Sequence, residues 1–130
     1  MLLVLGKVDI CPLQEALLNL EAAIVEAKSL LEIAGTIQYF EHSYELTWKT
    51  LHKTLIASGK NVFKNPRIVF REAAAAGLLE DPEQWFKFID WRNETSHAYD
   101  EEVARRIFAM LPLFRDHVRE VIRILEALQQ

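Results

Sequence analysis

The sequence is poor in cysteine, glycine and proline, and each shortage narrows the classes of protein it can specify. A single cysteine, Cys11, excludes an internal disulfide framework and any zinc or iron–sulfur site built from several cysteines. Four glycines and four prolines suit long helices better than a turn-rich β fold. No uncharged run approaches the roughly 18–20 residues that a bilayer-spanning helix needs, so we expect no membrane partner.

The start of the chain lacks the features of a secretory signal. The segment from Met1 to Gly6 is apolar, but it has no basic residues before it and no small-residue cleavage site after it. We therefore expect a cytoplasmic protein whose residues 1–10 form a short N-terminal arm. Residues 11–130 are expected to form one domain, because 130 residues suffice for one ordinary domain but not for two.

The composition is that of a globular protein with a modest acidic excess. Hydrophobic residues make up 51% of the chain and charged residues 26%, which excludes a disordered or low-complexity protein. Fifteen basic and 19 acidic residues give a formal charge of −4. A protein that wraps nucleic acid over its whole surface is therefore not expected.

Apolar residues recur at intervals of three and four, the spacing of one face of an α-helix. The first helix is predicted to begin at Pro12, whose missing N–H costs nothing in a first turn, and to break at Gly35. A second helix is expected to end at Gly59. The two expected stripes are Leu13, Leu17, Leu20, Ile24 and Leu31, then Ile37, Phe40, Tyr44, Trp48, Leu51 and Leu55.

Three further helices are predicted from residues that cap helix starts. Asn65 and Asp81 each precede a proline suited to a first turn, and Asp100 precedes two glutamates. Gln84 lies three residues after Asp81, as in a capping box. The last two apolar stripes are Trp85, Phe86, Phe88, Ile89 and Trp91, then Val103, Ile107, Met110, Phe114, Val118, Val121 and Leu125.

These signals together predict an all-α fold, an antiparallel up-and-down helical bundle of about five helices joined by short loops. The third helix is expected to end at Gly77, and the fourth to fray near Thr95 and Ser96. Pro112 is expected to kink or divide the last helix.

Basic residues are concentrated in the middle of the chain. Between residues 49 and 71 there is no Asp or Glu, and the six basic residues there are Lys49, Lys53, Lys60, Lys64, Arg67 and Arg71. This basic segment suits a surface for phosphates, RNA or an acidic partner. A solvated face at the end of the second helix is the alternative, since charged runs are common on helical proteins.

The four histidines do not predict a metal centre. His42, His52, His97 and His117 lack the spacings of zinc ligands, and no His-Glu-x-x-His motif occurs. We expect neither a metal nor another cofactor. His117, beside Asp116, is expected to be a surface residue.

Polar side chains of several kinds gather where the fourth helix is expected to end. Arg92, Asn93, His97 and Tyr99 lie within eight residues, at a junction that can direct side chains to one point. A guanidinium can neutralise a phosphate and an imidazole can transfer a proton near neutral pH. Because RNA carries its own 2′-OH nucleophile, such a pair could cleave it without a metal. Alternatively, Arg92 pairs with Asp90, Glu94 or Asp100 and His97 caps a helix end.

The segment Arg92-Asn-Glu-Thr-Ser-His97-Ala-Tyr99 resembles the Arg-x4-His-x-Tyr motif of HEPN-domain proteins of the HepT-like branch. The likeness extends over roughly residues 10–128 and is closest to the nucleotidyltransferase substrate-binding proteins. It is carried by four further blocks: Phe40 to Lys49, Asn65 to Leu79, Asp81 to Trp85, and Ser96 to Glu102.

The resemblance implies a helical bundle that forms a homodimer, with both motifs near the dimer interface. It also implies a partner, a minimal nucleotidyltransferase, in a two-component, toxin–antitoxin-like system. On this basis Arg92 would hold the scissile phosphate and His97 would act as general acid or base. Asn93 would orient His97 or hydrogen-bond the phosphate. Tyr99 would be the acceptor of AMP, whose bulk and charge would silence a nuclease.

Three functional hypotheses follow. The first is a HEPN-type substrate-binding or partner subunit of a minimal nucleotidyltransferase. The second is a metal-independent endoribonuclease toxin that uses Arg92 and His97 and is inhibited by adenylylation of Tyr99. The third is a non-catalytic helical scaffold. The basic segment would serve RNA or the transferase in the first two.

Overall fold

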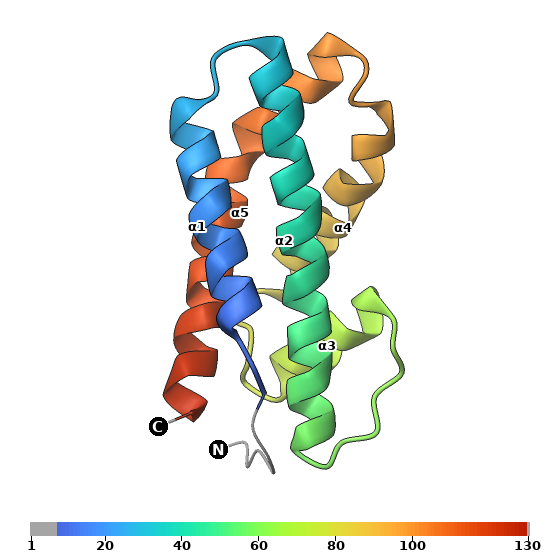
Figure 1. Ribbon diagram of the computed structural model, residues 1–130. Helices are drawn as coiled ribbons and strands as arrows, with labels where there is room; N and C mark the ends of the chain where they lie inside the picture. The colour runs from blue at the N-terminus through green and yellow to red at the C-terminus, as the bar shows by residue number, and fades with distance from the viewer. Residues whose placement is uncertain (1–7, 130) are drawn as a thin grey trace.

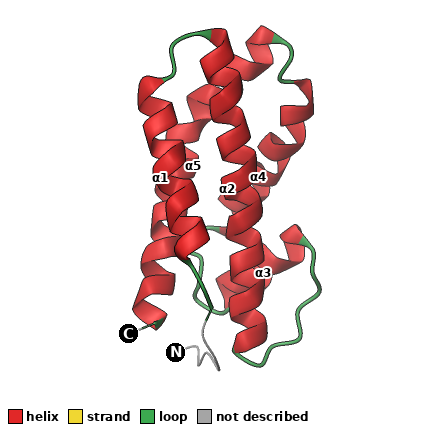
Figure 2. Cartoon of the chain, in the orientation of Figure 1, coloured by secondary structure: helices red, strands yellow, loops and turns green. Residues whose placement is uncertain are grey.

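The computed structural model describes residues 8–129 of the chain, and every regular element in that range is helical (Figure 2). The elements are α1 (Cys11–Glu26), α2 (Leu30–Ala57), α3 (Pro66–Ala75), α4 (Pro82–Glu94), the 3₁₀ turn η1 (Thr95–His97) and α5 (Glu101–Leu128). The predicted all-α bundle of five helices is thereby confirmed.

Three long helices form the frame of the bundle. Helices α1, α2 and α5 lie alongside one another, the shorter α3 packs on α2, and α4 packs against α3 and α5 (Figure 1). Helices α2 and α5 have 28 residues each, about 42 Å at 1.5 Å per residue. The end of α4, where the Arg/His motif begins, meets α2 through the ion pairs of Arg92 with Glu41 and Glu45.

The core is built around aromatic rings from four helices. Phe40 of α2 meets Phe114 of α5 edge-on at 4.7 Å between centroids, and Phe88 of α4 meets the same ring at 5.1 Å. Trp85 lies 5.0 Å from Phe88 and 4.9 Å from Phe70 of α3. Such tilted and edge-to-face contacts add to the energy of burying the rings, so one cluster fixes four helices.

The boundary between the first two helices differs from the prediction. The break lies at residues 27–29, and Gly35 is inside α2. Ser29 begins α2 with a complete capping box: its side chain accepts a hydrogen bond from the Glu32 backbone N–H, and Glu32 accepts from that of Ser29. These reciprocal bonds fix the start of α2 at Ser29, whereas Gly35 allows a helix to break but does not require it. Leu31, expected in the apolar stripe, is 83% exposed in the first turn of α2.

The other predicted helix ends are confirmed. Asn65, Asp81 and Asp100 each accept backbone N–H bonds at the start of α3, α4 and α5. Gly59 and Gly77 follow α2 and α3 with φ of 92° and 81°, values that favour glycine.

Pro112 does not divide the last helix. Helix α5 runs without interruption from Glu101 to Leu128 across this residue. Leu111, directly before Pro112, and Phe114, two residues after it, are fully buried, and their packing holds the helix together despite the missing N–H. Proline therefore removes one backbone donor here without ending the element.

Part of the expected N-terminal arm can be described. Residues 1–7 lie outside the described range. Ile10 is buried in the core, and the carbonyl of Val8 accepts a hydrogen bond from the side chain of Gln129. The last residues before α1 are thus attached to the end of α5.

Alanine substitution should lower the free energy of unfolding strongly in the aromatic cluster and hardly at all at the exposed start of α2. Phe114→Ala should lower the free energy of unfolding by about 3–5 kcal/mol, because it removes a ring that three other aromatic residues contact. Leu31→Ala should change it by less than about 0.5 kcal/mol. Urea denaturation followed by circular dichroism measures both, and a large loss for Leu31→Ala would contradict the exposed position of this residue.

Candidate functional site

The motif residues lie in the segment that runs from the end of α4, through a 3₁₀ turn, toward the start of α5. The α-helix ends at Glu94, close to the predicted position, and continues as one 3₁₀ turn through His97. The hydroxyl of Thr95 donates to the carbonyl of Arg92 (2.7 Å), and that of Ser96 to the carbonyl of Asn93 (3.0 Å). The same two carbonyls also accept from the backbone N–H of Thr95, and these bonds together fix the path of the turn.

Arg92 points at α2. Its Nη1 lies 3.2 Å from Glu41 Oε2 and donates to the Thr95 hydroxyl at 3.0 Å, and its Nε lies 3.8 Å from Glu45 Oε1. Sequence reasoning named Asp90, Glu94 and Asp100 as alternative partners, and that prediction was wrong. The carboxylates come from α2, where positions 41 and 45 are one helical turn apart and share a face.

The positive charge of Arg92 is already neutralised by its surroundings. One guanidinium faces two carboxylates, so its charge is more than matched before any ligand arrives. Its Nε is buried without a hydrogen-bond acceptor, since 3.8 Å to Glu45 is an ion-pair distance only. Glu45 is shared, because it also accepts a hydrogen bond from Trp48 Nε1 (3.1 Å) and lies 3.9 Å from Lys49 Nζ.

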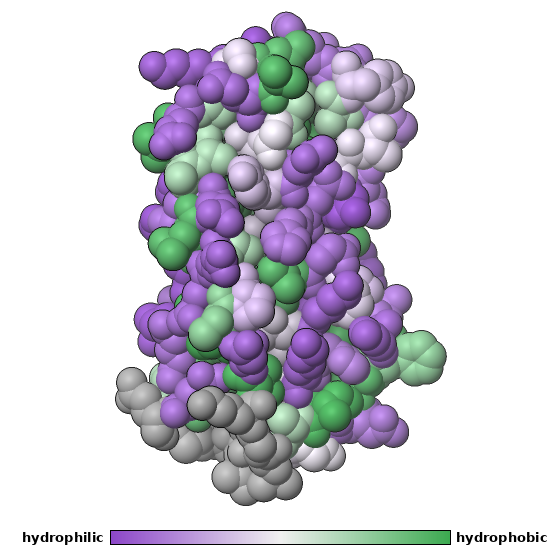
Figure 3. Space-filling model, in the orientation of Figure 1, coloured by the Kyte–Doolittle hydropathy of each residue, from purple (hydrophilic) through white to green (hydrophobic). Residues whose placement is uncertain are grey.

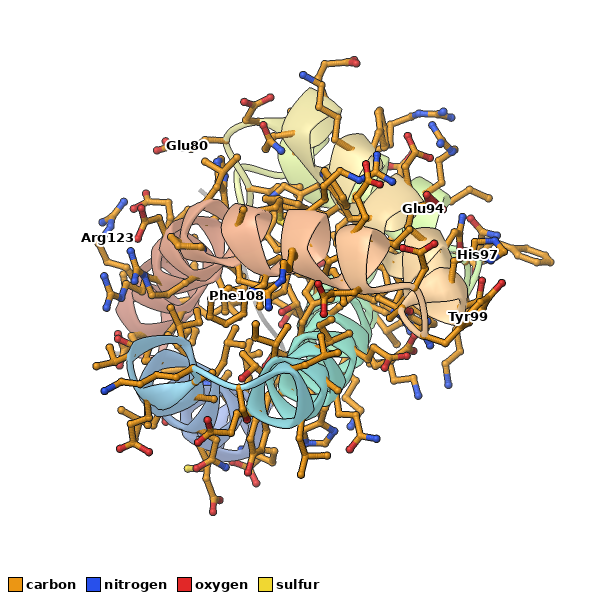
Figure 4. All side chains as sticks on the ribbon, turned by 90° about the horizontal axis from the view of Figure 1, so that it is seen from above. Glu80, Glu94, His97, Tyr99, Phe108 and Arg123 are labelled. Carbon is orange, nitrogen blue, oxygen red and sulfur yellow. The ribbon has the colours of Figure 1, made fainter. Side chains whose placement is uncertain are left out.

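His97 and Tyr99 face solvent instead. Tyr99 is 87% exposed and His97 is exposed beside it, with 6.3 Å between the ring centroids. Figure 4 places both at the outer rim of the bundle, on the side away from Glu80 and Arg123. Asn93 is also exposed. The four predicted residues thus lie on the consecutive segment from the end of α4 to just after η1, where Arg92 has carboxylate neighbours and His97 a phenol neighbour.

Tyr44 contrasts with Tyr99. It lies in the core beside Phe40 and Phe70, as predicted, and burial together with the nearby Glu45 raises the pKa of its phenol. A buried phenol with a raised pKa stays protonated and out of reach of a second protein. Of these two tyrosines, only Tyr99 presents its hydroxyl to solvent.

The six residues of the basic segment are all exposed. Lys49 lies between Glu45 and the face of Trp48, and the guanidinium of Arg67 lies over the Phe86 ring at 4.7 Å. The segment covers the end of α2, the α2–α3 loop (residues 58–65) and the first turns of α3. It lies at the other end of α2 from the α1–α2 connection (Figure 1).

The remaining histidines have structural surroundings. His52 donates a hydrogen bond from Nε2 to the Val62 carbonyl (2.9 Å). His117, expected to be a plain surface residue, is half-buried with its ring 5.5 Å from Phe88 and 6.4 Å from Trp85. Within residues 8–129, no group of three His, Cys, Asp or Glu side chains is arranged to hold a metal ion. None of the helices in that range is long and apolar enough to cross a membrane.

The sequence did not predict the surroundings of three residues that the structure makes important. Glu41 and Thr95 hold Arg92, and the four-residue spacing of Glu41 and Glu45 was the available signal. Phe63, 79% exposed in the α2–α3 loop, was not singled out although it lies among lysines in the sequence.

Comparison with known proteins finds relatives over nearly the whole described range. Residues 8–130 match the family described as nucleotidyltransferase substrate binding protein like. A Haemophilus influenzae protein named probable ribonuclease HepT is 37% identical over 105 residues, which cover 75% of this chain and 68% of that protein.

Two solved structures share the fold. A crystal structure of a Thermus thermophilus protein has a TM-score of 0.77 and 34% identity, covering 91% of this chain and 99% of that one. A Haemophilus influenzae structure, described as the fold of a substrate binding domain of a nucleotidyltransferase, has a TM-score of 0.76 and 29% identity. It covers 94% of this chain and 100% of that one. The helical bundle and its terminal motif therefore belong to the nucleotidyltransferase substrate-binding-protein-like family, of the HepT-like HEPN type.

Proposed function

We propose that this chain is the partner subunit of a minimal nucleotidyltransferase and that Tyr99 is the residue it offers to that enzyme. Support comes from the family match over residues 8–130 and from the relative described as a substrate binding domain of a nucleotidyltransferase. The observation that carries the proposal is the 87% exposure of Tyr99, next to His97 and on a turn fixed by side-chain hydrogen bonds.

The chemistry asked of Tyr99 is simple. Its phenol oxygen attacks the α-phosphorus of a nucleoside triphosphate bound by the transferase, an oxygen–phosphorus bond forms, and pyrophosphate leaves. The phenol gives up its proton in the same process. Because the ring projects from the bundle, the triphosphate can approach in line without any helix moving. The resulting phosphodiester adds negative charge two residues from His97.

Adenylylation should depend on Tyr99 alone among the tyrosines. When the full-length chain is incubated with the nucleotidyltransferase, ATP and Mg²⁺, intact-mass measurement should show the gain of one AMP per chain. Tyr99→Phe should abolish that gain. Tyr39→Phe is the matched control, since Tyr39 is 43% exposed on α2 and should leave the modification unchanged.

Complex formation is measured separately by size-exclusion chromatography with light scattering. Tyr99→Phe should still bind the transferase, because one hydroxyl is a small part of an interface. A chain that binds no transferase in either form would rule out the partner role itself, whereas binding without AMP transfer would rule out only the acceptor role.

A second candidate function, a metal-independent endoribonuclease, is favoured by one specific observation. Arg92 in the last turn of α4 and His97 at the end of η1 lie five residues apart, and a 37% identical relative is named a probable ribonuclease. In this mechanism Arg92 holds the scissile phosphate and His97 transfers the proton, with Asn93 as a neighbour of both. Such a phosphate must compete with Glu41 and Glu45 for the guanidinium.

Cleavage of RNA in EDTA should then require both motif residues. His97→Ala should reduce the rate by about 10²-fold or more, as loss of a general acid or base does, and Arg92→Ala should reduce it as well. His42→Ala is a matched control, because His42 is exposed on α2 and should leave the rate unchanged. Cleavage that survives His97→Ala would exclude His97 as the catalytic group.

The arginine variant needs its own control, because removing Arg92 leaves Glu41 facing no cation. Arg92→Ala combined with Glu41→Gln removes that unpaired charge. Both variants are checked for folding by circular dichroism. Inactivity shared by the single and the double variant would then be due to the missing guanidinium and not to a disturbed α4.

A further inference from the structure

The α2–α3 loop presents an aromatic ring to solvent on a rigid support. Phe63 is 79% exposed, while its neighbour Val62 is 8% exposed and belongs to the core. Burial of Val62 thus anchors the loop directly beside the exposed ring of Phe63. In Figure 3, hydrophobic atoms protrude at the lower right, over the region of α3 and this loop.

Hydrogen bonds hold the loop in this form. His52 donates from Nε2 to the Val62 carbonyl (2.9 Å), and the Lys60 N–H donates to the Leu55 carbonyl (3.1 Å). The Asn65 N–H donates to the Phe63 carbonyl (2.9 Å). A loop backbone held in this way loses little conformational entropy when the loop binds a partner.

Two lysines flank Phe63 in the sequence. Lys60 and Lys64 lie within three residues of Phe63, and both are exposed. Six of the 15 basic residues occur between residues 49 and 71, where no acidic residue occurs. In a chain of formal charge −4, this is a local positive region.

An exposed aromatic ring with lysines close to it in the chain suits nucleic acid better than a protein partner. Lysine is depleted in protein–protein interfaces, and such interfaces need an extended apolar centre, of which one phenyl ring is too little. Single strands of RNA or DNA are bound by the opposite arrangement, in which isolated aromatic rings stack on bases and nearby cations contact phosphates. Paired bases cannot stack on an exposed ring, so a duplex does not fit.

We propose that the α2–α3 loop binds single-stranded nucleic acid, with Phe63 stacking on one base and Lys60 and Lys64 contacting the adjacent phosphates. The site does not depend on the activity of the motif at the end of α4. It also goes beyond the role of partner subunit, because it gives the protein a ligand of its own.

Fluorescence anisotropy with the full-length chain and a labelled oligouridylate tests this proposal. Phe63→Ala and Phe63→Leu should each weaken binding at least about fivefold, since stacking requires a ring and not merely an apolar side chain. Phe63→Trp should bind at least as tightly as the wild type. Leu31→Ala is the matched control, an apolar side chain of similar exposure (83%) near the other end of α2, and it should bind as the wild type does.

The charge component has a separate readout. Replacing both Lys60 and Lys64 by alanine should reduce the slope of log affinity against log salt by about 1.4, or about 0.7 for each phosphate that is no longer neutralised. Lys28→Ala, in the α1–α2 connection, should leave the slope unchanged. A single-stranded DNA of the same length should behave as the RNA does.

The results that overturn the proposal are equally definite. They are a wild-type chain that binds no single strand, binding that Phe63→Leu leaves unchanged, or equal affinity for a duplex. Loss of transferase binding in the Lys60/Lys64 double variant, with oligonucleotide binding intact, would assign the loop to the protein partner instead. None of these outcomes depends on AMP transfer or on RNA cleavage.

Discussion

The edge-to-face aromatic cluster is the interaction on which the other features of this bundle depend. Phe40 of α2 and Phe88 of α4 both pack edge-on against Phe114 of α5, so this ring sets where α4 lies relative to α2. The position of α4 in turn decides what Arg92 can reach. A partly exposed ion pair contributes only up to about 1 kcal/mol, so Glu41 and Glu45 select the direction of the Arg92 side chain without holding the helix.

Much of the fold could be predicted because it is encoded locally. Asn65, Asp81 and Asp100 form hydrogen bonds with N–H groups two or three residues away, and such signals are readable without tertiary structure. The errors arose where two local signals competed. Gly35 is tolerated inside a helix whose start is fixed by the Ser29–Glu32 capping box, and Pro112 is tolerated where its neighbours are buried on one face.

The candidate site was predicted in its composition but not in its contacts. The motif identified Arg92, Asn93, His97 and Tyr99, and the predicted end of α4 placed them on one turn. That Arg92 meets carboxylates from α2 depends on the packing of helices about 50 residues apart, which no local pattern records. Nor could the burial of Val62 and the exposure of Phe63 be predicted, because both are apolar and only the path of the loop separates them.

Helix α2 contacts Arg92 of the motif and leads directly into the α2–α3 loop, and it therefore sets the distance between these two regions. Glu41 holds Arg92 near one end of this span, and the loop that carries Phe63 begins directly after Ala57 at the other. Sixteen residues of continuous helix separate these positions, which is about 24 Å along the axis. An α-helix packed on three sides does not stretch, so α2 works as a fixed spacer. Any single ligand that touches both regions must be flexible and long enough to cover that length.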